Sequence, residues 1–290
     1  KRQLQSLHIA QDVSHCNEGH AAFLGLERIR NLVLRRRLTF AEALEVVRSS
    51  SLFTTHTPVP AGHDAFPEAM VRQYLSHYPG ELGIDWAQFI GLGRVDPEDP
   101  NEKFSMSVLA CNLSQEVNGV SWLHGEVSKE ILGNLWPGYF KNELHIGYVT
   151  NGVHFPTWTA TRLRRLYARY FPEGFEGHEY RISEWKKVYD IPDEDLWRER
   201  LVLKEKLVRM IRRRYCDPGH VRMDSPHQVM QVLEGIKPDV LKIGFARRFA
   251  TYKRALLLFT DLDRLAAIVN NKERPVQFIF AGKAHPNDKP

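Results

Sequence analysis

Cysteine is scarce in this sequence of 290 residues. The three that occur, Cys16, Cys111 and Cys216, are far apart, odd in number and form no Cys-x-x-Cys pair. A disulfide-stabilised scaffold and a cysteine-based zinc site are therefore poor interpretations. We expect a reducing compartment, the cytoplasm, because thiols persist there.

Long apolar runs are also missing. No stretch approaches the roughly 20 residues that span a bilayer, and residues 1–5 are not followed by the apolar core of a signal peptide. We therefore expect no membrane partner. Because the sequence has no initiator Met and stops soon after a strand-like run, we expect an internal piece of a longer protein.

The net charge of +5 comes largely from short basic clusters. The clusters at residues 35–37 and 212–214 fall late in helix-like segments, where cations suit the helix dipole and the solvent. No RRM, KH or helix-turn-helix pattern accompanies them, so a nucleic-acid partner is not expected. The other basic clusters, near residues 247 and 253, are considered separately.

Length and periodicity predict two α/β domains. We expect the boundary just past Asn151, with domains at residues 1–155 and 156–290. The expected strands of the first part are residues 8–13 and 146–149, with a loop at 54–67. A Thr39/Glu42 capping-box pattern opens one helix. The expected helices are residues 21–37, 40–48, 68–76, 105–132, 158–170 and 192–214, the last closed by a turn at 217–219.

The final part of the sequence predicts a strand–helix–strand unit. Residues 240–246 and 276–282 read as buried strands, and residues 252–269 read as the helix between them. Short loops joining these elements require a parallel pair with a right-handed crossover. The helix should turn four apolar side chains inward: Leu256, Leu257, Leu265 and Ile268.

A basic loop follows the first of these strands. It carries Arg247, Arg248, Lys253 and Arg254 between the strand end and the expected first turn of the helix. Ligands bind outside the carboxyl ends of parallel strands, and cations gathered at a helix N-terminus favour a bound anion. The loop therefore predicts a phosphate site, to which Lys283 at the next strand end could add charge. No GxGxxG or P-loop pattern occurs, so a nucleotide is not indicated.

Several histidines and aromatic residues are further candidates. His15, Glu18 and His20, or His56 and His63, do not have metal-ligand spacing, so we expect no metal and interpret them as neutral groups that bind a polar ligand or close a loop. Asn151 could offer a donor and an acceptor to a sugar hydroxyl, or simply form a turn. Trp122, Trp136 and Trp158 could stack on a ligand, although core packing is the ordinary role of a Trp.

Seven segments resemble the α-glucan (glycogen, starch and maltodextrin) phosphorylase family, in family order over nearly the whole chain. The similarity is closer to the short bacterial and archaeal branch than to the animal enzymes. The segments are residues 17–23 (NEGHAAF), 54–64 (TTHTPVPAGHD), 118–128 (NGVSWLHGEVS), 135–138 (LWPG), 149–154 (VTNGVH), 244–254 (GFARRFATYKR) and 280–286 (FAGKAHP).

The resemblance implies a fold, a reaction and a cofactor. The fold would be the two-domain glycosyltransferase-B type, with Rossmann-like domains and a cleft, present only in part. Residues 1–155 would be the C-terminal part of the N-terminal catalytic domain, and residues 156–290 the first part of the cofactor-binding domain. The reaction would be reversible phosphorolysis of terminal α-1,4-glucosyl units to glucose 1-phosphate. Pyridoxal 5'-phosphate would act through its phosphate, and the partners would be glucan and inorganic phosphate.

The resemblance also implies roles for individual residues. Arg248 matches the substrate-phosphate arginine, Lys253 the lysine beside both phosphates, and Arg247 a basic residue on the cofactor phosphate. Tyr252 lies in the same motif and is expected at the substrate. Three residues complete the implied site: Asn151 on the glucosyl unit, Trp158 near the cofactor ring, and His20 in the catalytic cleft.

Two departures from the family pattern limit these implications. Where the animal enzymes are expected to hold the sugar 6-hydroxyl with a His before the Val-Asn-Gly segment, the sequence has Gln115. The Schiff-base lysine would lie in a later Gly-rich segment beyond Pro290. These 290 residues alone are therefore expected to be inactive and to carry no covalent cofactor.

Other interpretations stay open from the sequence. A nucleotide-sugar-dependent glucan glycosyltransferase would share the fold and the basic loop without pyridoxal phosphate. The alternative that is not an enzyme is a non-catalytic, glucan-binding fragment. Chain-length preference, regulation and assembly, including a homo-oligomer, are not specified by the sequence.

Overall fold

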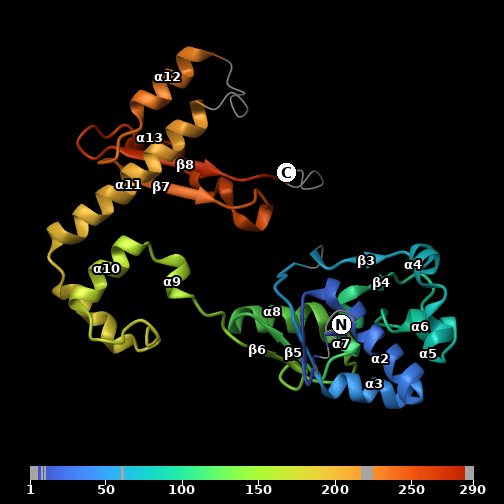
Figure 1. Cartoon of the computed structure of the whole chain (residues 1–290). Coiled ribbons are helices and arrows are strands. Elements are labelled where there is room, and N and C mark those ends of the chain that lie inside the picture. The colour runs from blue at the N-terminus through green and yellow to red at the C-terminus, as the bar shows by residue number, and fades with distance from the viewer. Residues whose placement is uncertain (1–5, 8, 10, 60–61, 217–224, 285–290) are drawn as a thin grey trace. The chain divides into compact units, whose positions relative to one another are not determined.

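The computed structural model describes the chain except residues 1–5, 8, 10, 60–61, 217–224 and 285–290. It is a mixed α/β structure with parallel sheets, divided into two compact units, Lys1–Gly152 and Val153–Pro290. The first unit runs from blue to green in Figure 1, and the second from green to red. Within the described ranges, no helix is both long and apolar enough to cross a membrane.

A four-stranded parallel sheet forms the centre of the first unit. Its spatial order is β1-β2-β5-β6. Each short strand buries one apolar residue in the core: Cys16, Phe53, Val117 and Ile146. Other positions, such as His15 on β1 and Tyr148 on β6, are exposed, so the faces of this sheet are only partly covered. The bounds are β1 Ser14–Asn17, β2 Ser51–Thr54, β5 Glu116–Gly119 and β6 Ile146–Tyr148.

Two sequence predictions for this sheet are wrong. The strand expected at 8–13 lies later, at β1, while His8 and Ala10 are outside the described residues and the other four positions are not strand. The helix expected over 105–132 is split by β5. Both strands have only four residues and polar ends, so their apolar content was too small to be distinguished from loop or helix. The strand at 146–149 is confirmed as β6.

Helices pack around this sheet. The helices expected at residues 21–37, 40–48 and 68–76 are confirmed, whereas those at Tyr78–Leu82 and Trp86–Gly91 were not predicted. The capping box is present: the Thr39 side chain accepts from Glu42 N, and the Glu42 carboxylate accepts from Thr39 N. A two-stranded antiparallel pair, β3 Ala65–Phe66 with β4 Phe104–Ser105, lies outside the sheet. The helices are η1 Gly19–Ala21, α2 Phe23–Arg36, α3 Phe40–Ser49, α4 Glu68–Leu75, α5 Tyr78–Leu82, α6 Trp86–Gly91, α7 Met106–Asn112, α8 Trp122–Leu132 and η3 Gly133–Leu135.

The core of the first unit is a single apolar cluster. Phe53 on β2, Phe89 on α6 and Phe104 on β4 are fully buried in it, and the rings of Phe89 and Phe104 are stacked at 6.2 Å. Ile29 of α2 and Val117 of β5 belong to the same cluster. Because the helices and the sheet share these contacts, this core fixes the positions of the strand ends.

The second unit begins with helices around an aromatic cluster. Phe155, Phe171 and Phe175 are buried there, and Trp185 meets each of them edge-on. The elements are α9 Phe155–Trp158, α10 Thr161–Tyr170, η4 Ile182–Asp190, α11 Asp193–Cys216 and α12 Pro226–Gly235. The predicted helices at 158–170 and 192–214 correspond to α10 and α11, and the turn expected at 217–219 lies outside the described residues.

The predicted strand–helix–strand unit is confirmed in its parallel pairing and corrected in its detail. Strands β7 Leu241–Ala246 and β8 Val276–Ala281 pair in parallel. The intervening segment is two 3-10 turns, η5 Thr251–Lys253 and η6 Ala255–Phe259, followed by α13 Leu262–Val269. Arg254 has φ +56°, a left-handed conformation that no continuous helix can contain.

The expected burial of this unit is wrong in the described chain. Leu256, Leu257 and Ile268 are exposed, as are Leu241 and Ile243 on β7. One short helix is too small to cover both faces of a two-stranded sheet, so these apolar side chains stay exposed.

Phe53 should be among the most sensitive positions of the first unit. Phe53→Ala removes a fully buried ring and should lower the free energy of unfolding by about 3–5 kcal/mol. Phe140, which is 75% exposed, provides the control: Phe140→Ala should change it by less than about 0.5 kcal/mol. Guanidinium unfolding of both variants measures the difference, and equal effects would contradict the assigned core.

Candidate functional site

The carboxyl ends of the four parallel strands bring polar side chains to one edge of the sheet. His15 on β1, Thr54 on β2 and Asn118 on β5 meet there: His15 Nε2 lies 2.7 Å from Thr54 Oγ1, and Asn118 Nδ2 donates to the same oxygen at 3.0 Å. These contacts join three strands at the edge where ligands bind in α/β sheets.

Glu18 connects this edge to the loop that follows β2. It directly follows β1 with φ +67°, an uncommon conformation for a residue other than Gly. Its Oε1 accepts hydrogen bonds from His56 N and from Thr57 Oγ1. The carboxylate therefore fixes the loop after β2, and with it the exposed imidazole of His56. Strain of this kind persists where surrounding contacts over-determine the backbone, often at functional sites.

Close backbone approach requires glycine beside these groups. A Cβ atom at Gly119, the last residue of β5, would lie 2.8 Å from Gly125 N and 2.8 Å from His124 Nδ1. Only glycine allows β5 to run this close to the first turn of α8. Gly119 is therefore a packing requirement within the strand.

Two partly hidden histidines present unpaired nitrogens near this edge. His63 Nδ1 lies 2.6 Å from Ser107 Oγ, and His124 Nδ1 accepts from Val120 N at 3.2 Å. Within the described residues, the Nε2 atom of each is buried without a hydrogen-bond partner. Burial lowers the pKa of His63, although Glu18 acts in the opposite direction. A buried polar atom without a partner commonly awaits a water or a ligand.

The structure brings some predicted residues to this edge and separates one. His20 lies in η1, directly after β1, and Asn151 follows β6, with Asn151 N donating to Val120 O at 3.1 Å.

Gln115 precedes β5, at the opposite, amino-terminal edge of the sheet. Its N donates to Arg48 O and Ser51 O at 3.0 and 3.1 Å, and its side chain lines a pocket of about 270 Å³ beside Trp136. This position does not support the expected contact between Gln115 and the sugar at the carboxyl edge.

A second candidate site lies at the carboxyl end of β7 and β8. Phe249 N donates to Lys283 O at 3.0 Å, which ties the two strand-end loops together. Gly282 is required there, because a Cβ would lie 2.0 Å from Arg247 O. The two loops predicted from sequence as a phosphate site are thus held side by side. His285 and Pro286 of the second loop lie outside the described residues.

The cations of this edge have no acidic partner in the part of the chain that the structure describes. Among the residues that the structure describes, no carboxylate forms an ion pair with Arg247, Arg248, Lys253 or Lys283. Lys253 Nζ lies 4.6 Å from the centroid of the Tyr252 ring, a cation–π contact that orients both side chains. Arginine forks and lysine ammonium groups carried by two adjoining loops are suited to an anion with several negative oxygens.

The remaining predictions concern an aromatic residue and metals. Trp158, at the end of α9, is 77% exposed, so its ring is available to a ligand. Within the described ranges, no group of three or more His, Cys, Asp or Glu side chains could hold a metal ion. The helix expected after the basic loop begins instead with a 3-10 turn: Arg247 and Arg248 precede it and Lys253 is its last residue. A regular helix therefore does not supply N-terminal N–H groups to an anion bound at this loop.

Sequence inspection missed several members of the first edge. Asn118, Thr54 and Ser107 had not been assigned a role at the edge, and Glu18 was considered only as a metal ligand. The signal that could have found them is the Asn-Gly pair after a single apolar residue, Val117, which marks a short strand ending in a turn. Recognising β5 would have placed Gln115 before the strand and Asn118 at its functional end.

The depressed pKa of His63 predicts a pH-dependent stability. The unfolded chain binds a proton at this residue near pH 6.5, whereas the folded chain resists it. Stability is therefore lost as pH falls through about 6.5. Between pH 7.5 and pH 5, the free energy of unfolding should fall less in His63→Gln than in the wild type, because Gln binds no proton in the unfolded chain. Replacing the exposed His77 by Gln is the control, and identical slopes for wild type and His63→Gln would contradict the assignment.

Comparisons with known proteins give a consistent relationship. No family model matches the chain. The maltodextrin phosphorylase of Thermococcus litoralis is 43% identical over 289 residues, 99% of this chain and 33% of the relative. The glycogen phosphorylase of Aquifex aeolicus is 43% identical over 287 residues, 98% of this chain and 40% of the relative.

A third relative extends the same pattern. The glycogen phosphorylase of Mycobacterium tuberculosis is 41% identical over 290 residues, 96% of this chain and 32% of the relative. The chain thus spans between a third and two fifths of these relatives' length. Over nearly all of its own length it is homologous to a segment of the glycogen and maltodextrin phosphorylases.

Proposed function

We propose that the complete protein catalyses phosphorolysis of terminal α-1,4-linked glucosyl units of glycogen, starch or maltodextrin, releasing glucose 1-phosphate. One observation carries this proposal: cations at the carboxyl ends of β7 and β8 that have no acidic partner within the described chain. Inorganic phosphate is the anionic substrate of this reaction, and similarity to named phosphorylases is independent support. Three free thiols, of which two are buried, support a cytoplasmic location.

The proposal extends to the architecture. We infer that residues 1–155 contribute the end of an N-terminal catalytic domain and residues 156–290 the start of a C-terminal one, in a glycosyltransferase-B arrangement. Parallel sheets in both units support this, because each offers the carboxyl edge that such a cleft requires.

Pyridoxal 5'-phosphate is the proposed cofactor. The charge and exposure of these side chains suit such a group: among the described residues no carboxylate pairs with Arg247 or Lys253, and the Trp158 ring is exposed to an aromatic ligand. When bound, the cofactor supplies a phosphate group that exchanges a proton with the substrate phosphate. Arg247 and Lys253 would hold that phosphate group.

The chain's own residues would bind the substrates. The planar guanidinium of Arg248 can grip two oxygens of inorganic phosphate, while Lys253 offers a point charge to both phosphates. Bringing two anions close together requires such cations, which also stabilise charge in the transition state. Asn151, His20 and Tyr252 would bind the glucosyl unit through polar atoms that donate to or accept from its hydroxyls.

Arg248 provides the direct test in the complete protein. Arg248→Ala should lower phosphorolysis at subsaturating phosphate by roughly 30-fold to several thousand-fold, since truncating a charged partner of a buried anion typically costs about 2–5 kcal/mol. Arg264→Ala, an exposed change on α13, is the matched control. Initial rates against phosphate concentration measure both, and near-normal rates for Arg248→Ala would sink the assignment.

The position of Gln115 gives a second prediction. Gln115→Ala should leave the preference for glucose 1-phosphate over its 6-deoxy analogue within about twofold of wild type, because the residue lies at the opposite edge of the sheet from Asn118. Asn151→Ala is the positive control and should lower kcat/KM for both donors. Removing a buried polar partner usually costs about 1–3 kcal/mol. If Gln115→Ala lowered the preference by about tenfold or more, Gln115 would belong to the sugar site.

A further inference from the structure

A pocket lies at the amino-terminal edge of the four-stranded sheet, beside Trp136. Its volume of about 270 Å³ suits a ligand smaller than a typical drug molecule. None of the residues proposed to hold phosphate, cofactor or the glucosyl unit lines it. Its side chains come from the end of α3, from the segment around the start of β5 and from the segment before β6, and those used below are Arg48, Ser114, Gln115, Trp136, Tyr139 and His145.

His145 connects two other aromatic rings of this pocket. Its ring centroid lies 6.3 Å from that of Trp136 and 5.9 Å from that of Tyr139, at interplanar angles of 54° and 60°. These three rings, the aromatic cluster, offer apolar faces to a flat ligand. The indole N–H groups of Trp86 and Trp185 donate to protein acceptors, whereas that of Trp136 donates to none of the described residues. This donor is therefore available to a ligand.

Arg48 brings a positive charge to the pocket. No Asp or Glu is among the described residues that line it. Arg48 Nε is buried without a hydrogen-bond partner in the described chain, which commonly indicates a water or a ligand. Its ion pair with Glu45 spans 3.3 Å, and the two side chains are 41% and 70% exposed. Because exposed pairs are weak, the guanidinium can exchange this partner for a carboxylate in the pocket.

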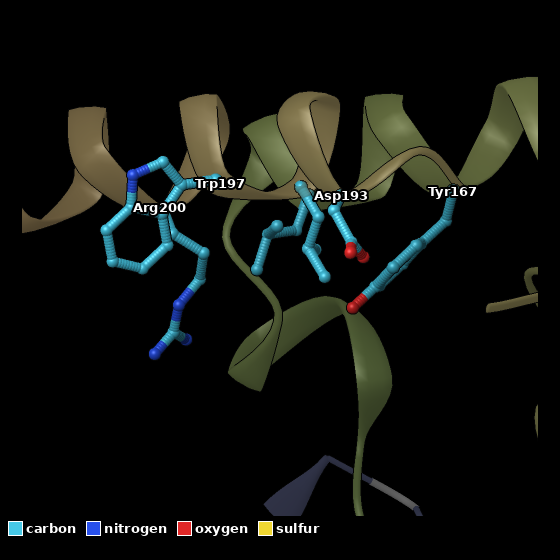
Figure 2. A pocket seen from close by; sticks show the side chains of 6 residues that line it. Tyr167, Asp193, Trp197 and Arg200 are labelled. Carbon is cyan, nitrogen blue, oxygen red and sulfur yellow. The ribbon is translucent and has the colours of Figure 1, made fainter. Parts of the chain in front are cut away.

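The larger pocket beside Trp197 has a different pattern of charge (Figure 2). Its volume is about 520 Å³, and it lies between α10 and the start of α11. Both Asp193 and Arg200 line it, so an anion attracted by the arginine would be repelled by the aspartate. The pocket beside Trp136 combines aromatic rings and an arginine without an acidic lining residue. It therefore favours an anion that carries a ring.

These features select one chemical class of ligand. A cation would be repelled by Arg48, and an inorganic anion would leave the aromatic cluster uncovered. We propose that the pocket binds a small planar carboxylate, an aromatic or heteroaromatic acid with a single ring. The ring would stack on the aromatic cluster, and the carboxylate would accept hydrogen bonds from Arg48. The Ser114 hydroxyl and the Gln115 amide would bind polar substituents of the ring.

Isothermal titration calorimetry of the complete protein with 4-hydroxybenzoate tests this site. A ligand of about ten non-hydrogen atoms should bind with a Kd on the order of 0.1–1 mM. The uncharged isostere 4-hydroxybenzamide should bind about tenfold or more weakly, because it forms no charge-assisted pair with Arg48. In Arg48→Gln the two probes should bind within about twofold of each other. Trp136→Leu should weaken both probes by about threefold or more and keep the preference for the acid.

Matched variants and competitors decide the proposal. Arg36→Gln on α2 and Phe140→Ala lie outside the pocket and should bind both probes like the wild type. Arg248→Ala should do the same, so the result does not depend on the proposed function. Absence of saturable binding, equal binding of acid and amide to the wild type, or a preference for the acid that survives in Arg48→Gln would overturn the proposal. Displacement of the probe by phosphate or maltose at equal concentration would also overturn it. The comparison of acid and amide in the wild type holds even where a substitution impairs folding.

Discussion

Parallel strand pairing is the constraint on which the candidate chemistry depends. Because β1, β2, β5 and β6 run in one direction, every strand of the first unit ends at the same edge, and residues far apart in the sequence meet there. His15, Thr54 and Asn118 are separated by up to about a hundred positions, yet they share one hydrogen-bonded group. Glu18 then extends this edge outward by fixing the loop that carries His56.

The same constraint organises the second unit with fewer strands. The backbone bond between Phe249 and Lys283, and the close approach at Gly282, hold two cationic loops together without any acidic partner among the described residues. Backbone contacts thus hold the loops that carry the repelling charges. Such an arrangement costs free energy unless an anion balances the charge, and the proposed phosphate site depends on this electrostatic preorganisation.

The sequence was most informative where a pattern is long. Amphipathic helices such as α2 and α11, the Thr39 capping box and the strand pair β7–β8 could all be predicted from periodicity and turn chemistry. The basic loop could be predicted as a strand-end site because its cations follow an apolar strand directly. Four-residue strands carry too little pattern, so β2 and β5 were missed, and with them the correct edge for Gln115.

Other features depend on the third dimension alone. The left-handed conformation of Arg254 interrupts an apolar segment that looks continuous in sequence. The pocket beside Trp197 arises from two helices whose facing residues are about thirty positions apart, so no local motif marks it. Glu18 has no sequence signal for its strained backbone, because the strain results from bonds made by the distant residues His56 and Thr57.

Product analysis of the complete protein tests the central claim most directly. Maltoheptaose and inorganic phosphate should be incubated with the protein carrying pyridoxal 5'-phosphate, and the phosphorus-containing products followed by ³¹P nuclear magnetic resonance. The account predicts a new resonance of α-glucose 1-phosphate that grows only when glucan and phosphate are both present. Free glucose without glucose 1-phosphate, or glucosyl transfer only after a nucleotide sugar is added, would contradict it.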